Sequence, residues 1–178
     1  MMKSMVALAL ELGFSNAAVV DTGEIPFEPA FRVCCEDNAC GKYGVNYACP
    51  PDCGTPQQMA ERIHAHQHAL VLQTLWEIDD PMDNLKVKPA KGAHNRMERA
   101  LIDRFQEKWP GGFMVGASGC NVCETCAITE GKPCRFPALK FSCMSAYCVF
   151  VRKLAERCGL EYDCGPGLVA LFGMYVFD

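Results

Sequence analysis

The sequence contains no apolar run that is long enough to cross a bilayer. The last apolar run, Leu168 to Phe177, has ten residues, whereas a membrane-spanning helix needs about 20. Near the N-terminus, six uninterrupted apolar residues precede Glu11, and no small-residue cleavage site follows them. This is too short for the core of a signal peptide. We therefore expect a soluble, cytoplasmic protein with no membrane partner.

Runs of like charge are also missing. The chain has 17 Lys and Arg residues against 21 Asp and Glu residues, for a net charge of -4, and such a balance does not favour a nucleic-acid partner. There is neither a phosphate-binding glycine-rich loop nor a G-x-S-x-G elbow. Nucleotide hydrolysis and serine-hydrolase chemistry therefore have no support.

Cysteine, in contrast, is abundant. The chain of 178 residues has 13 cysteines, and half of its residues are apolar, so one domain of this length can bury a core without disulfide bonds. In a reducing cytosol, cysteine-dense motifs more often bind metal or act in catalysis than form structural disulfides. If the predicted localisation holds, disulfides are the least favoured use of these thiols, and zinc or iron-sulfur clusters remain.

The denser motif is CNVCETCAITEGKPCRFP, residues 120–137. Its spacing is Cys120-x2-Cys123-x2-Cys126-x7-Cys134. Zinc ribbons use two separate C-x2-C pairs, whereas cysteines at successive three-residue steps can wrap around three irons of a cubane. The spacing therefore favours a 4Fe-4S cluster. Pro133 precedes Cys134, the reverse of the order in two-cluster ferredoxins, and we expect Cys134 to close the same cluster.

A second group of cysteines lies in CCEDNACGKYGVNYACPPDCG, residues 34–54. Three clear candidate ligands follow the spacing Cys35-x4-Cys40-x8-Cys49. We take Cys53 as the fourth ligand, with Cys34 or a residue from elsewhere as alternatives. A second 4Fe-4S cluster is the favoured occupant, and structural zinc is the alternative. A cluster with only three protein ligands would leave one iron open to a substrate.

Periodicity and capping signals predict an alternation of helices and strands. Helices are expected over 2–12, from Pro56 onward, and over 93–109 and 144–157; strands are expected over 17–21, 69–78, 113–117 and 168–177. Residues 79–92, with two prolines, read as a surface connection. We expect an α/β fold with a mixed sheet flanked by helices and with both cysteine-rich cluster loops following strand ends.

The predicted order of elements occurs twice, in residues 1–80 and 92–178. It indicates either an internal duplication of an αβ unit or ordinary helix-strand alternation. In both cases we expect one metal-binding domain that covers residues 1–178.

The two cysteine motifs together resemble a known family. CEDNACGKYGVNYACPP, with CNVCETCAITEGKPCRFP and the following SAY, is similar to uncharacterised prokaryotic proteins described only as predicted metal-binding proteins, a domain of unknown function. The resemblance covers nearly the whole chain and implies a small cytosolic protein of anaerobes, but it implies no activity. It implies metal or iron-sulfur sites at the positions matching Cys35, Cys40, Cys49, Cys120, Cys123, Cys126 and Cys134.

Four further cysteines follow the second motif, and two of them depart from the family. Cys143 and Cys148 stand where relatives have small residues such as Ser and Gly. The spacing Cys143-x4-Cys148-x9-Cys158-x5-Cys164 loosely echoes the first group, so a third cluster is one interpretation. On the predicted helix, however, about 140° separates Cys143 from Cys148. We therefore expect these cysteines to pack in the core.

These observations favour an electron-transfer protein with two 4Fe-4S clusters. The alternatives are a zinc-dependent structural interaction module and an iron-sulfur enzyme with an open iron, so the sequence does not decide whether the protein is an enzyme. The expected partner is a redox protein or a small-molecule substrate. Arg32 and Arg135 lie near the two motifs, where cations would raise the potential of an anionic cluster.

Overall fold

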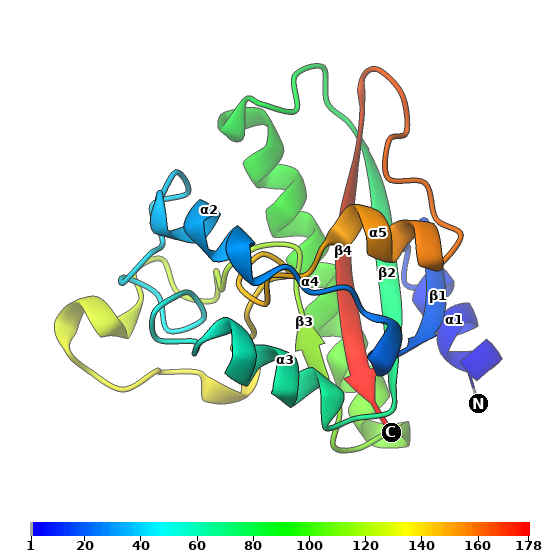
Figure 1. Cartoon of the computed structure of the whole chain (residues 1–178), viewed down its shortest axis with the longest axis horizontal. Coiled ribbons are helices and arrows are strands. Elements are labelled where there is room, and N and C mark those ends of the chain that lie inside the picture. The colour runs from blue at the N-terminus through cyan, green and yellow to red at the C-terminus, as the bar shows by residue number, and fades with distance from the viewer. Residues whose placement is uncertain (1) are drawn as a thin grey trace.

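A twisted antiparallel sheet forms the centre of the computed structural model, which describes residues 2–178 (Figure 1). Within these residues the four strands are β1 (Asn16–Asp21), β2 (His68–Glu77), β3 (Phe113–Val115) and β4 (Leu168–Phe177), in the order β1-β2-β4-β3. The two long strands, β2 and β4, pair along their whole length, from His68 opposite Phe177 to Glu77 opposite Leu168. The short strands β1 and β3 form the edges.

Helices cover both faces of the sheet. They are α1 (Met2–Glu11), α2 (Arg32–Glu36), α3 (Pro56–His64), α4 (Asn84–Lys108) and α5 (Val151–Arg157). In Figure 1, α1 and α4 lie behind the sheet and α3 and α5 lie in front of it. The short α2 stands to one side, near the two cysteine motifs.

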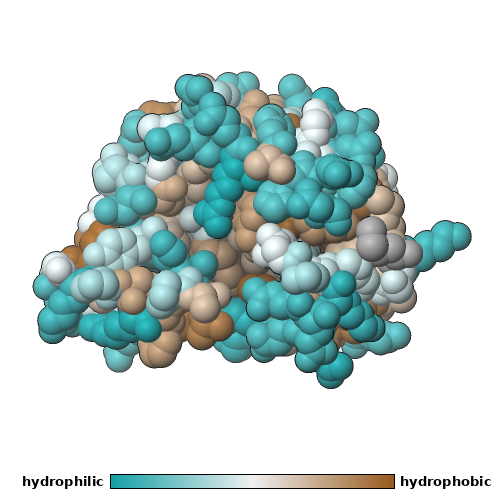
Figure 2. Space-filling model, turned by 90° about the horizontal axis from the view of Figure 1, so that it is seen from below, coloured by the Kyte–Doolittle hydropathy of each residue, from teal (hydrophilic) through white to brown (hydrophobic). Residues whose placement is uncertain are grey.

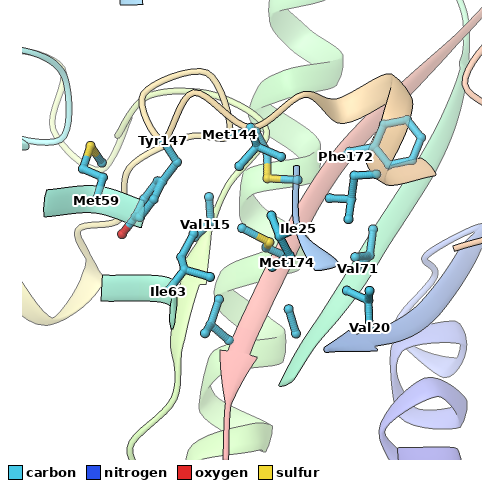
Figure 3. Packing of buried hydrophobic residues seen from close by; sticks show 14 of the residues in the cluster. Val20, Ile25, Met59, Ile63, Val71, Val115, Met144, Tyr147, Phe172 and Met174 are labelled. Carbon is cyan, nitrogen blue, oxygen red and sulfur yellow. The ribbon is translucent and has the colours of Figure 1, made fainter. Parts of the chain in front are cut away.

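Each face of the sheet has its own core because successive strand residues point to opposite faces. On β2, Leu70 and Leu72 pack behind the sheet with residues of α1 and α4, while Ala69 and Val71 pack in front. The front core, shown in Figure 3, consists mainly of Val20, Ile25, Met59, Ile63, Val71, Val115, Met144, Tyr147, Leu154, Phe172 and Met174.

Most element positions confirm the sequence-based expectations. All four strands and the helices α1 and α3 lie within two residues of the predicted starts. Helix α3 begins as expected at Pro56, and Thr55 and Gln58 form a reciprocal capping box in which Thr55 Oγ1 accepts from the Gln58 amide at 3.2 Å.

The expectation of a mixed sheet is wrong, because each of the three strand pairings is antiparallel. Strands β2 and β3, which α4 connects, do run parallel to each other. However, β4 lies between them and pairs with both. This is a split βαβ arrangement. Helix-strand alternation correctly indicated the crossover through α4. It could not indicate that β4, the last strand in the sequence, lies between β2 and β3.

Two helix boundaries also differ from the expectation. Residues 84–92, expected in a surface connection, form the first turns of α4 even though the helix contains Pro89. Burial of Val87 and Ala90 against Leu171 offsets the disruption by proline. Helix α5 begins at Val151 instead of residue 144. The preceding residues form turns, in which Cys148 adopts a positive φ of 55°.

The two halves of the chain occupy equivalent positions in the sheet. In each half a helix behind the sheet (α1 or α4) precedes an edge strand, and a helix in front (α3 or α5) precedes a central strand. The antiparallel contact of β2 with β4 relates the halves by an approximate two-fold axis. This is the arrangement that an internal duplication would produce, and duplication itself stays a prediction.

One face of the molecule is largely polar. Figure 2 views the molecule from below, where hydrophilic residues cover most of the face and apolar residues show between them in small groups. A search of residues 2–178 finds no helix with the length and apolar character needed to span a membrane.

Candidate metal centre

The two cysteine motifs lie side by side, at the side of the sheet that carries β3 (Figure 1). The Asn46 amide donates a hydrogen bond to the Cys120 carbonyl at 2.8 Å, and the Tyr47 hydroxyl donates to the Lys132 carbonyl at 2.8 Å. The segments also approach at Gly119, where an added Cβ would lie 2.9 Å from Cys49 Sγ. Segments separated by 70 or more residues therefore form one cysteine-rich region.

The four cysteines of the second motif surround one hollow. The motif directly follows β3, as expected, and its hollow of about 140 Å³ is lined by Cys120, Cys123, Cys126 and Cys134, among others. About 10–15 Å³ is enough for one water molecule, so this space can hold a group larger than a single ion. Cys134 thus lines the same hollow as the other three cysteines, and its role in closing a cluster there stays a prediction.

Arg135 lies at the rim of this hollow and contacts the motif directly. Its guanidinium donates to the Thr125 carbonyl at 2.9 Å and to the Glu130 carboxylate at 2.8 Å. A hydrogen bond to Cys123 and the charge of Glu130 raise the pKa of Arg135. The guanidinium is therefore a fixed positive charge beside a candidate ligand.

The start of the second motif is held by α4. Asn95 is fully buried, and its amide donates to Ser118 Oγ at 3.0 Å and accepts from the Ser118 amide at 3.3 Å. Arg99, one turn further along α4, lies near Cys120 and partly offsets the rise in its pKa that burial causes. Sequence reasoning missed Asn95, because a polar residue in an amphipathic helix normally indicates the solvent-facing side.

The first cysteine group begins on α2, well beyond the end of β1, so it does not directly follow a strand as expected. Cys34 and Cys40 are exposed, Cys35 and Cys53 are half-buried, and Cys49 is buried. Gly44, with φ of 67°, supplies a left-handed turn between Cys40 and Cys49. This turn brings the two thiols to the same region of the loop.

Cys143, from a distant part of the chain, also lies near this group, which the sequence did not predict. It lies deep in the protein while keeping part of its surface accessible to solvent. Burial raises the pKa of Cys35 to about 11, and the nearby thiol of Cys143 adds to the rise. Burial also raises the pKa of Cys49, with Cys143 again the strongest charge acting on it. A bound metal cation would reverse these shifts, because it stabilises thiolates.

Other cysteines of the C-terminal segment are arranged differently. Cys148 is fully buried and Cys158 packs against the front core, as core packing predicted, whereas Cys164 donates to the Glu161 carbonyl at 3.5 Å. The predicted helical separation of Cys143 from Cys148 does not apply, because both precede α5.

The thiols of neither cysteine group converge on a single point. Among the residues that the structure describes, no three His, Cys, Asp or Glu side chains are placed to hold one metal ion. A zinc ion requires four ligands at roughly 2.0–2.3 Å from a single centre. Binding one ion at either group would therefore require these side chains to move closer together.

A second hollow adjoins the first. It has a volume of about 290 Å³, its lining includes Cys53, Arg62 and Tyr147, and it shares Tyr47 and Lys140 with the first hollow. Burial raises the pKa of Tyr147 to about 12, which keeps its hydroxyl protonated near neutral pH. The hollow thus presents positive charge and a phenolic donor next to the cysteine-rich region.

Comparison with known proteins gives one family match. No curated protein and no solved structure matches the chain. The model of a family described as Predicted metal-binding protein (DUF2284) matches residues 18–177, which include both cysteine motifs and every strand but the start of β1. The chain therefore belongs to this family of predicted metal-binding proteins, as the resemblance of its two motifs indicated.

Proposed function

We propose that this protein binds two 4Fe-4S clusters and transfers single electrons. The observation that carries the proposal is the hollow of about 140 Å³ that Cys120, Cys123, Cys126 and Cys134 line together. The second cluster would be held by Cys35, Cys40 and Cys49 with a fourth ligand, for which Cys53 was the candidate from sequence.

The size and spacing of the second motif favour a cluster over zinc. In a cubane each thiolate binds a different iron, so the sulfurs need not meet at one centre as they do around zinc. Cysteines at three-residue steps around a wide hollow fit that requirement. A bound cluster supplies one-electron chemistry, and its potential depends on nearby charge and hydrogen bonds.

The protein residues around the motif would stabilise an anionic group. Arg135 contacts Cys123, and Lys42 and Lys140 line the same hollow. These cations favour the more negative, reduced state of whatever the thiolates hold. The close approach of Cys49 to Gly119 further supports electron transfer between the two sites, because it makes the sites neighbours.

The second hollow favours a small molecule as the other redox partner. Arg62, Lys140 and Tyr147 would attract and hydrogen-bond an anionic acceptor there, next to Cys53. This is the observation in favour of the alternative in which the protein is an iron-sulfur enzyme. In the electron-carrier version, a redox partner protein docks near the same rim and exchanges one electron per cluster.

Anaerobic purification with iron and sulfide analysis tests the proposal. We expect a brown protein with about eight iron and about eight acid-labile sulfide per chain, and electron paramagnetic resonance signals after reduction. Cys126→Ser should lose about half of the iron. The matched control, Cys164→Ser, lies outside both groups and should retain all of it. A colourless protein with stoichiometric zinc and no labile sulfide would contradict the proposal.

A further inference from the structure

We propose that Cys143, from the second half of the chain, is the fourth ligand of the metal site formed by Cys35, Cys40 and Cys49. The inference rests on the proposed function only for the presence of metal in the first cysteine group, and it holds for a cluster or for zinc.

The segment that carries Cys143 is built into the N-terminal region of the fold. Glu28 donates its amide hydrogen to the Cys148 carbonyl, and Phe150 donates to the Pro26 carbonyl, both at 2.8 Å. On the other side, Cys143 forms an isolated β-bridge with Gly116, whose carbonyl accepts from the Met144 amide at 2.9 Å. Residues 143–150 are thus fixed between the chain before α2 and the start of the second motif.

Arg32 connects this segment to the first cysteine group. It is the first residue of α2, the helix that carries Cys35, and its guanidinium donates to the Gly54 carbonyl at 3.1 Å and to the Ala146 carbonyl at 2.9 Å. One side chain therefore holds together the beginning of the first cysteine loop, its end, and the segment of Cys143.

The backbone on the C-terminal side of Cys143 is anchored in the front core. Met144 is 3% exposed and Tyr147 is 1% exposed, and Figure 3 shows both side chains directed into the packed residues next to Met59 and Val115. Because these anchors leave little freedom to the backbone, the position of the adjacent Cys143 backbone is set before any metal binds. Only the thiol side chains of the group then need to move closer together to bind a metal.

Cys143 lies beside the first cysteine group. It forms a bridge with Gly116, and Gly119, three residues further along, comes so close to Cys49 that an added Cβ would lie 2.9 Å from the Cys49 sulfur. Cys35 is close enough for electrostatic interaction with Cys143, Cys148 and Cys40, and Cys49 with Cys143, Cys40, Cys53 and Cys35. Cys143 interacts in turn with Cys40. For both Cys35 and Cys49, the strongest thiol interaction is with Cys143, ahead of those with Cys40 and Cys53 where these occur.

The surroundings of the Cys143 sulfur suit a thiolate ligand. The backbone amides of Ala146 and Ser145 lie near the Cys143 sulfur and favour its thiolate form. Amide donors to sulfur are a standard feature of iron-sulfur sites, where they stabilise the negative charge of the ligand. Cys143 itself is partly buried and packs against the edge of the front core.

The other candidates for the fourth ligand fit less well. Cys53 Sγ faces Met59 Sδ at 3.5 Å and the Gly54 carbonyl at 3.9 Å. Cys34 is exposed on α2, and its neighbouring position on the helix turns it about 100° away from Cys35. Cys148 is sealed in the core at 1% exposure. Cys143 is the thiol whose segment is held beside the group by Arg32 and by the bridge to Gly116.

Metal analysis of paired variants tests the assignment. Under anaerobic conditions we expect the iron content of Cys143→Ser to be about four per chain, against about eight in the wild type. One of the two cluster signals in electron paramagnetic resonance should be lost or altered. The double variant Cys34→Ser/Cys53→Ser should retain the full iron content. Cys148→Ser is the matched control, since it changes a buried thiol of the same segment, and it should also retain all of the iron.

Several results would overturn the assignment. These are a full iron content with an unchanged resonance spectrum in Cys143→Ser, or a halved content in the double variant or in Cys148→Ser. If Cys143→Ser does not fold, the double variant and Cys148→Ser decide by themselves. If the wild-type protein contains about two zinc per chain, the iron-sulfur proposal is refuted but the assignment of Cys143 is not. In that case Cys143→Ser should drop to about one zinc.

Discussion

A single fixed charge at the second cysteine motif sets an expectation for its redox potential. Arg135 donates to the Thr125 carbonyl and lies close enough to Cys123 to interact with its sulfur. Reduction adds negative charge to a cluster, so removing this cation should disfavour reduction. We expect Arg135→Ala to lower the midpoint potential of one cluster, on the order of tens of millivolts.

A potentiometric titration followed by electron paramagnetic resonance measures this change. The shift should shrink at high salt, because Arg135 is solvent-accessible and its charge is screened. Arg135→Lys should preserve part of the effect. The control is Arg152→Ala, whose arginine pairs with Asp163 away from both motifs. An unchanged or higher potential in Arg135→Ala at low salt would contradict the expectation.

A buried carboxylate behind the same motif predicts a dependence of stability on pH. Glu98 is fully buried on α4, and its Oε1 lies 3.1 Å from His94 Nε2. Burial raises the pKa of Glu98 above its usual 4.5, although His94 opposes the rise. The folded protein therefore holds this proton more tightly than the unfolded chain, so the free energy of unfolding should fall as pH rises from about 4.5 through the raised pKa.

Urea unfolding at a series of pH values tests this expectation. Glu98→Gln cannot ionise and should flatten the decline that begins above about pH 4.5. Glu107→Gln, which changes an exposed carboxylate of the same helix, should keep the wild-type slope. If the free energy of unfolding depends on pH equally in the wild type and in Glu98→Gln, the Glu98 carboxyl titrates alike in the folded and unfolded states, and the expectation is wrong.

At this scale, the sequence could name candidate ligands but could not indicate which of them lie close together. The cysteines of each motif could be named from their spacing alone. Cys143 could not be assigned to the first group, because roughly a hundred residues separate it from Cys40 and Cys49 and only the tertiary fold brings them together. Arg32 was expected as a nearby cation, but its role in joining Gly54 to Ala146 depends on the same fold.

At the scale of secondary-structure elements, the close packing of α4 against the sheet depends on a glycine in β4. An added Cβ at Gly173 would clash with the Glu98 carboxylate and lie 2.9 Å from the Val115 carbonyl oxygen on β3. We expect Gly173→Ala to reduce the free energy of unfolding by about 1–3 kcal/mol, the usual cost of overpacking. Denaturant unfolding measures it.

The matched control is Gly23→Ala. An added Cβ at Gly23 meets nothing within 4 Å, and its φ is not in the left-handed region. This variant should unfold at nearly the wild-type denaturant concentration. If Gly173→Ala behaves like Gly23→Ala, then α4 can move away from β4 at little cost, and the tight contact is not required for stability.

Local sequence signals predicted elements well where local interactions decide the structure. The capping box at Thr55 and the strand runs are examples. They failed at the start of α4, where burial of Val87 and Ala90 overrides Pro89, and at α5, where contacts of residues 148–150 with residues 26–28 replace a helical turn. Local signals could not predict the relative directions of paired strands, because these depend on the position of β4 in the sheet.

For the molecule as a whole, the division into a sheet with two cores and a separate cysteine-rich region predicts the effect of metal removal. The cores are formed by apolar residues of the strands and helices. The cysteine loops are instead joined by single hydrogen bonds such as that of Asn46 with Cys120. After oxidative removal of metal, we expect residues 36–54 and 118–140 to lose protection from hydrogen exchange, while β2 and β4 retain it.

Hydrogen exchange with mass spectrometry would measure both regions in one experiment. The Cys126→Ser variant serves as a control. Because it should already lack metal in the second loop, removing its remaining metal should change the exchange of that loop less than in the wild type. Equal loss of protection in the loops and in β2 and β4 would instead mean that the metal sites hold the entire fold together.

The central position of β4 has a consequence for how the protein is made. β4 fills the space between β2 and β3, yet it is the last of the four strands to leave the ribosome. Until residues 168–177 are synthesised, β2 lacks its longest partner and exposes an unpaired edge. The first cysteine loop is translated well before Cys143 and before the sheet that positions them both. We therefore expect metal to enter a chain whose translation has already passed β4, and not one still growing.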